Sequence, residues 1–363
     1  MRPRLLVVGR TRFTFPLGET LQRRFDALSA ELEWRQLGAG RSTDERFALA
    51  PPFPIRRLDG FAFYLALPFR VARELRRFRP DGVIAQGLQE TALVLLARAL
   101  ARVPAKVIAD VHGDWRAPTR LYGSPARRLL DPLADVLARI GLRRADGIRT
   151  ISGYTTGLVR ASGREPDAEF PAYMDLEPFL GPAVPLPEAP TALFVGVLER
   201  YKAIDVLAAA WPGVRERVPE ARLHVVGSGS LSVPAGEGIT WSPSLPTAEV
   251  AAALDAATLL VLPSRSEGMG RVLVEAFCRG RGVVGSRVGG IPDLVRDGEN
   301  GLLVPPADAA ALADELARVL GDPELADRLG RGALASAPAW IATPEEFARR
   351  LRVLVEQVTR LSA

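Results

Sequence analysis

The chain has 363 residues, 48% of them hydrophobic and 25% charged, which is typical of a globular protein with cores for two domains. A single cysteine and two histidines exclude a disulfide framework and a thiolate metal cluster. The sequence has no run of about 18 uncharged apolar residues, and the apolar run within residues 1–9 is too short for a signal peptide. We therefore expect a cytoplasmic protein without a spanning helix.

Strand-like and helix-like segments alternate through the first half of the chain. Apolar runs predict strands at 5–9, 82–85, 106–111 and 147–152. Helical spacing predicts helices at 18–28, 61–78, 90–101 and 124–144. Residues 34–56 have no clear pattern, and three prolines there rule out a long helix. This alternation is typical of a parallel, doubly wound α/β sheet.

A second set of alternating segments follows a proline-rich stretch. Five prolines between residues 175 and 190 predict a stiff linker and a domain boundary. The sequence therefore predicts Rossmann-like domains at 1–180 and 181–342, and then a helix over 343–363 that begins with a Thr343–Glu346 capping box. Further strands are predicted at 192–198, 223–227, 239–241, 259–262 and 283–286.

The segment after the strand at 259–262 carries two carboxylates in a strand-to-helix turn. Gly268 and Gly270 allow the backbone to approach a ligand, and the N–H groups of residues 268–270, Met269 included, predict an anion site at the helix start. Glu267 lies in the turn, and Glu275 lies about two turns into the helix near its buried side. A buried carboxylate needs hydrogen-bond donors, which the two hydroxyls of a ribose would supply.

This segment resembles the signature of retaining, family-four glycosyltransferases of the GT-B type. The shared features are Pro-Ser-x-Ser-Glu-Gly-x-Gly with a second glutamate eight positions after the first, and the downstream runs 285–293 and 300–305. The resemblance implies two Rossmann-like domains facing each other across a cleft, with the last helix crossing back to the first domain. It also implies a nucleoside diphosphate sugar as donor, and neither a metal ion nor any other cofactor.

The resemblance also implies roles for the two glutamates and for two residues elsewhere. Glu275 would bind the ribose, and Glu267 the hydroxyls of the donor sugar. Lys202 and the backbone of residues 268–270 would bind the diphosphate. His112, at the end of a predicted strand, would lie near the sugar; the alternative is a buried histidine bonded to a neighbouring aspartate.

The glycine-rich loops depart from the pattern of this family. After Gly196 the family usually has an arginine where this chain has Val197, and Lys202 precedes an alanine instead of a glycine. Arg200 could supply the missing charge on the diphosphate, or it could be a solvated loop residue. Gly18 resembles the end of the first glycine-rich loop, although Leu17 replaces one glycine. Arg265 and Arg271, beside the glutamates, are either ligands or solvated.

Other functions fit the same fold. They are a nucleotide-sugar epimerase, a phosphorylase, and an inactive nucleotide-sugar-binding protein; a dehydrogenase is disfavoured because neither half opens with Gly-x-Gly-x-x-Gly. The acceptor stays open among a glycolipid, a polysaccharide and a small molecule, and we expect no nucleic-acid partner. Residues 1–180 hold 29 basic and 20 acidic residues. Arginines beside apolar residues in the helices at 61–78 and 124–144 predict peripheral contact with an anionic membrane surface, or else a solvated face.

Overall fold

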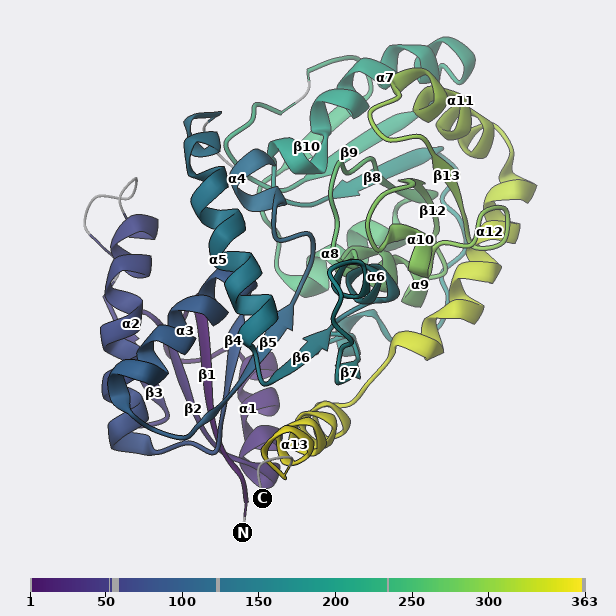
Figure 1. The fold of residues 1–363 in the computed structure, drawn as a ribbon. Helices are drawn as coiled ribbons and strands as arrows, with labels where there is room; N and C mark the ends of the chain where they lie inside the picture. Colours follow the sequence, from purple (N-terminus) through teal and green to yellow (C-terminus); the bar gives the residue numbers. More distant parts are fainter. Residues whose placement is uncertain (1, 52, 54–58, 122–124, 234, 361–363) are drawn as a thin grey trace. The chain divides into compact units, whose positions relative to one another are not determined.

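The computed structural model describes residues 2–51, 53, 59–121, 125–233 and 235–360 (Figure 1). The chain divides into two compact units. The N-terminal unit comprises Met1–Arg116, Leu129–Tyr173 and Ala342–Ala363, and the C-terminal unit comprises Ala117–Arg128 and Met174–Ile341. The main division therefore lies after Tyr173, a few residues before the boundary predicted at 180. Each unit contains one parallel sheet with helices between its strands, so the predicted two-domain α/β fold is confirmed.

The N-terminal unit is built on a seven-stranded parallel sheet of order β3-β2-β1-β4-β5-β6-β7. The chain order reverses between β1 and β4, which is the topological switch point of a doubly wound sheet. The sequence predicted neither β2 nor β3, which lie in the unpatterned stretch. The strands are β1 (Arg4–Arg12), β2 (Glu33–Ala39), β3 (Phe47–Ala50), β4 (Gly82–Gln86), β5 (Lys106–Val111), β6 (Gly147–Thr150) and β7 (Ala168–Glu169).

Helices cover both faces of this sheet. One face packs against α1 (Glu19–Glu31) and α13 (Pro344–Arg360), and the other against α2 (Asp59–Phe78), α3 (Leu88–Ala101), α5 (Asp131–Arg144) and α6 (Gly153–Ala161). The last helix, α13, buries Phe347, Leu351 and Val355 in the core of this unit, as predicted for a helix that crosses back to the first domain (Figure 1). At its start, Thr343 Oγ1 accepts the Glu346 N–H at 3.1 Å.

One predicted helix is wrong in its extent. Instead of a continuous helix over 124–144, a 3-10 helix at Pro125–Leu130 precedes α5, which begins at Asp131. Pro132 explains the break, because a proline in the first turn of a helix lacks an N–H donor and its ring would clash with a carbonyl one turn earlier. Ser124 lies outside the described residues.

The C-terminal unit contains a six-stranded parallel sheet of order β10-β9-β8-β11-β12-β13, with its switch point between β8 and β11 (Figure 1). Its strands are β8 (Thr191–Val195), β9 (Arg222–Val226), β10 (Ile239–Ser242), β11 (Leu259–Leu262), β12 (Gly282–Ser286) and β13 (Gly301–Val304). Its helices are α4 (Ala117–Leu121), α7 (Ile204–Arg217), α8 (Thr247–Asp255), α9 (Arg271–Cys278), α10 (Ile291–Leu294), α11 (Ala309–Leu320) and α12 (Pro323–Ser336). Ligands of such sheets bind where the order reverses, beyond the carboxyl ends of the strands. The loops after β8 and β11 lie at that place.

Candidate functional site

The structure brings Lys202 and Glu267 together across the switch point of the C-terminal unit. Lys202 lies in the 3-10 helix Arg200–Lys202 that follows β8, and Glu267 lies in the loop between β11 and α9. Lys202 Nζ donates a hydrogen bond to Glu267 Oε2 at 2.6 Å, and the two side chains are only 12% and 14% exposed. Ser264 Oγ also donates to Glu267 Oε2, at 3.4 Å. A half-buried carboxylate is thus held between two loops that are 65 residues apart in sequence.

Gly289 and Gly290 pack against the backbone of the Glu267 loop. A Cβ atom added to Gly289 would lie 1.9 Å from the Glu267 carbonyl oxygen, and one added to Gly290 would lie 2.3 Å from the Gly268 carbonyl oxygen. The Gly290 N–H donates to the Glu267 carbonyl oxygen at 3.1 Å. The backbone of the loop therefore rests directly on these glycines. Close packing against the Glu267 loop therefore gives a structural reason for glycine at these two positions.

Glu275 lies on the buried side of α9, as the sequence predicted. Its side chain is 10% exposed, and Arg271 Nε donates to Oε1 at 2.7 Å. Burial raises the pKa of the Glu275 carboxyl, and the charge and hydrogen bond of Arg271 oppose that effect only in part. Gly270, with φ of 84°, is the N-cap residue of α9, and its carbonyl oxygen accepts the Leu273 N–H at 2.9 Å.

The loop after β8 is held by an arginine that the sequence left open. Arg265 forms two hydrogen bonds of 2.7 Å with the carboxylate of Asp205, and it donates a third to the carbonyl oxygen of Arg200. Arg265 is therefore an anchor between the two loops. The side chain of Arg200 is exposed and forms no ion pair with the residues that the structure describes, and Val197 is exposed as well.

The turns after β8 and β9 contain small residues at positions where the backbone is left-handed or closely packed. Ala203 adopts φ of 54°, the left-handed conformation that glycine tolerates best, at the position where the family usually has glycine. A Cβ atom on Gly227 would lie 1.8 Å from the Gly196 carbonyl oxygen, so the turns after β8 and β9 touch through their backbones. Gly196 itself would meet only ordinary contacts with Phe194 and Lys202.

His112 lies at the carboxyl end of β5 in the N-terminal unit. Its side chain is 41% exposed, and its Nε2 is 2.7 Å from Asp110 Oδ2. Buried Asp110 also accepts a 2.7 Å hydrogen bond from Arg149 Nη1, and Arg149 donates further to the carbonyl oxygens of Phe170 and Pro171. Burial would raise the pKa of Asp110, but the charges and hydrogen bonds of Arg149 and His112 lower it to about 2. The ring is thus fixed by an ionised aspartate and still reaches solvent.

Sequence reasoning missed Arg149, although a charged residue within the otherwise uncharged strand at 147–152 was a usable signal. It also singled out Gly18, which is the N-cap residue of α1, where an added Cβ atom would meet nothing within 4 Å. His112 and Gly18 belong to the N-terminal unit, and the other predicted site residues belong to the C-terminal unit. Within the described ranges, no three His, Cys, Asp or Glu side chains are grouped so that they could hold a metal ion.

Two doubly wound units of this kind define the GT-B class of fold, and comparisons with known proteins agree. A model described as glycosyl transferases group 1 matches residues 189–322, and one described as glycosyl transferase 4-like domain matches residues 17–169. The chain belongs to this family of glycosyltransferases.

Individual relatives carry related names. The chain is 32% identical over 285 residues to D-inositol 3-phosphate glycosyltransferase of Corynebacterium efficiens, covering 69% of this chain and 66% of that protein. It is 25% identical to sulfoquinovosyl transferase SQD2 of Arabidopsis thaliana, covering 77% of this chain and 58% of that protein.

Solved structures share the fold along almost the whole chain. Sucrose-phosphate synthase from Thermosynechococcus elongatus superposes with a TM-score of 0.80 at 21% identity, covering 99% of this chain and all of that one. HepE from Anabaena, in complex with UDP and glucose, superposes with a TM-score of 0.67 at 17% identity, covering 99% of each chain.

Proposed function

We propose that this chain transfers a sugar from a nucleoside diphosphate sugar to an acceptor hydroxyl, with retention of the anomeric configuration. The observation that carries the proposal is the Lys202–Glu267 contact at the switch point, one loop away from the start of α9 and from buried Glu275. The complexes of HepE with UDP-glucose and with UDP and glucose support a nucleotide sugar as the donor.

Lys202 is suited to stabilise the diphosphate as it leaves. An ammonium group has three donors, and only one is needed for Glu267 Oε2. The remaining donors, together with the N–H groups of residues 268–270 at the start of α9, would bind phosphate oxygens. Positive charge at this place stabilises the negative charge that develops on the leaving group. In this proposal protein groups carry that charge without a metal ion, and exposed Arg200 is the candidate for a second cation.

The two glutamates would divide the donor between them. Both contacts of Glu267 fall on Oε2, so Oε1 is the oxygen that would accept a hydroxyl of the donor sugar. Glu275 accepts a hydrogen bond from Arg271 through Oε1, and its side chain is buried. The paired hydroxyls of a ribose would satisfy this carboxylate, which burial makes costly to leave ionised.

We assign no side chain as the general base. In the retaining reaction that we propose, the acceptor hydroxyl attacks from the face that the diphosphate leaves, and a phosphate oxygen of the leaving group takes its proton. We also propose that His112 contacts the donor sugar. With Nε2 bound to ionised Asp110, its Nδ1 edge is the one available to a hydroxyl.

A donor panel in a thermal-shift assay tests the proposal. Uridine, guanosine and adenosine diphosphate sugars are offered to the wild-type protein, and the matching donor at a hundredfold excess over its Kd should stabilise it by about 2.7 kcal/mol. Lys202→Ala should lose most of this shift. Lys106→Ala is the matched control, because Lys106 is the only other lysine of the chain and lies on β5 of the other unit. No shift with any donor, or an unchanged shift for Lys202→Ala, would contradict the proposal.

A further inference from the structure

The outer face of α2, α3 and α5 exposes an unusual number of large apolar side chains. The three helices pack side by side on one face of the N-terminal sheet. Together with the two residues before α5 they hold ten of the nineteen large apolar side chains that are exposed among the described residues. These ten are Phe61, Leu65 and Phe69 on α2, Leu96 and Leu100 on α3, Leu129 and Leu130 just before α5, and Leu133, Val136 and Ile140 on α5. Such a concentration marks an interaction surface rather than scattered exposure.

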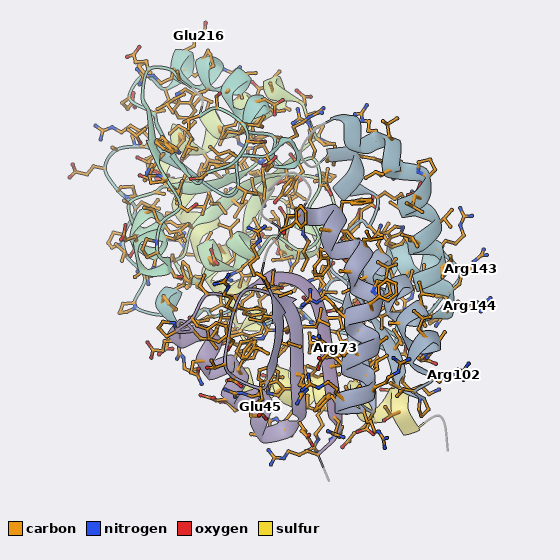
Figure 2. All side chains as sticks on the ribbon, turned by 90° about the vertical axis from the view of Figure 1, so that its left-hand side faces the viewer. Glu45, Arg73, Arg102, Arg143, Arg144 and Glu216 are labelled. Atoms are coloured by element: carbon orange, nitrogen blue, oxygen red, sulfur yellow. The ribbon has the colours of Figure 1, made fainter. Side chains whose placement is uncertain are left out.

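On each of the three helices, exposed arginines follow the exposed apolar residues toward the C-terminal end. On α2 the spacing of four residues continues from Phe69 to exposed Arg73 and Arg77. On the other two helices, exposed Arg102 directly follows α3, and exposed Arg143 and Arg144 end α5. The helices connect parallel strands in the same direction, so their C-terminal ends lie at the same edge of the layer. Figure 2 shows Arg73, Arg102, Arg143 and Arg144 on this layer.

The fully exposed charges of α2, α3 and α5 are of one sign. No aspartate or glutamate within α2, α3 or α5 is exposed: Asp59, Glu74 and Glu90 are buried, and Asp131 and Asp135 are half-buried. Arg77, Arg102, Arg139, Arg143 and Arg144 form no ion pair with any described residue. These five arginines therefore have no acidic partner among the described residues, whereas Arg73 lies 3.5 Å from Glu74.

We propose that this face, which we call the α2–α3–α5 face, binds the surface of an anionic lipid bilayer. The exposed arginines complement anionic headgroups, and the phenylalanine and leucine side chains would enter the boundary between headgroups and acyl chains. Within the described residues no helix is long and apolar enough to cross a membrane, so the contact is with the surface. A second copy of the chain fits the face less well, because a twofold contact would bring the same arginines together.

Cosedimentation with vesicles tests the charge contribution. Wild-type protein should bind vesicles of equal parts phosphatidylglycerol and phosphatidylcholine at low salt, and release them at high salt. Each cation near such a surface changes the partition coefficient about fivefold, so the double variant Arg143→Ser/Arg144→Ser should bind roughly 25-fold more weakly. The double variant Arg349→Ser/Arg350→Ser removes the same charge from exposed positions of α13, on the opposite face of the sheet, and should bind within about threefold of wild type.

The apolar contribution has its own matched pair. Phe61→Ser/Phe69→Ser should abolish binding even at low salt, whereas Val353→Ser, an exposed apolar residue of α13, should leave it unchanged. All of these side chains are exposed, so the variants should melt within a degree or two of wild type. The proposal is overturned if anionic vesicles do not bind, if both arginine doubles weaken binding equally, or if sedimentation velocity shows a lipid-free dimer that Phe61→Ser/Phe69→Ser dissociates.

Discussion

Replacing Asp110 by asparagine should destabilise the N-terminal unit strongly. The substitution keeps the size of the side chain but leaves the guanidinium of Arg149, which is only 3% exposed, without a counter-charge. The pKa of Asp110 is lowered from 3.8 to about 2, and one pKa unit corresponds to about 1.4 kcal/mol, which gives about 2.5 kcal/mol of stability at neutral pH. Removing one partner of a buried ion pair costs about 3–5 kcal/mol in other proteins.

We expect a loss of about 3 kcal/mol, near the lower end of that second range. Arg149 keeps two carbonyl acceptors, and its guanidinium carbon lies 4.2 Å from the centre of the Phe170 ring, so the charge is not left bare. For a unit of this size, such a loss lowers Tm by about 6–12 °C. Because the folded pKa of Asp110 lies below the unfolded value, its contribution is complete above about pH 4 and is lost as the pH falls toward 2.

Differential scanning calorimetry of Asp110→Asn beside Asp114→Asn measures the effect. Asp114 follows the same strand, is more exposed and lies 3.8 Å from Arg116, so its replacement should cost no more than about 0.5 kcal/mol. Wild type and Asp114→Asn should lose stability together between pH 4 and pH 2, and Asp110→Asn should lose correspondingly less over that interval. Equal melting temperatures of the two variants at pH 7 would refute the reasoning.

Three further predictions concern the donor site. Glu275→Gln should weaken the binding of a free nucleoside diphosphate about tenfold or more, since a charge-assisted hydrogen bond is worth roughly 1.5–3 kcal/mol. Glu267→Gln should change that affinity less than threefold but sharply lower the transfer rate. Equal losses of diphosphate affinity in calorimetry would show that the two glutamates do not have these separate roles. His112→Ala should impair transfer and leave diphosphate affinity unchanged; a lower Tm with normal turnover per folded molecule would remove it from the site. Gly289→Ala should abolish donor binding by displacing the Glu267 loop. Gly298 also has positive φ, but a Cβ atom there would meet nothing within 4 Å, so Gly298→Ala should lower the free energy of unfolding by only about 1 kcal/mol, as followed by thermal denaturation.

The repeating α/β pattern was predictable wherever the buried residues of a strand are apolar. β11 and β12 are buried throughout, and their sequences contain nothing but apolar residues, glycine and one serine. β2 was missed because its buried position 36 is a glutamine, whose Nε2 is satisfied by the carbonyl oxygen of Leu37 at 3.1 Å. A buried polar residue with a backbone partner breaks the apolar pattern without breaking the strand. Pro132 likewise shortened a helix that periodicity alone would extend.

The positions of Lys202 and Glu267 in loops of the C-terminal unit were predictable from their setting, but their pairing was not. Glu267 and Lys202 were each singled out, yet their 2.6 Å contact joins loops from two strands that only the sheet order makes neighbours. Arg149, which the sequence did not single out, meets Asp110 across adjacent strands 39 residues apart. Arg265 was left open between ligand and solvent because Asp205, its actual partner, lies 60 residues earlier. The local sequence therefore predicts which residue types occur at a site and how they are spaced. Which charged side chains form ion pairs depends on the tertiary topology.

The stereochemistry of donor turnover tests the central claim most directly. The donor identified in the thermal-shift panel is incubated with wild-type protein, with water as the surrogate acceptor, and the first-formed sugar is observed by proton NMR before it mutarotates. We predict release of the nucleoside diphosphate together with a sugar of the same anomeric configuration as in the donor, and almost no turnover by Glu267→Gln or Lys202→Ala at saturating donor. A bound donor that is never cleaved, or a first product of inverted configuration, would contradict the account.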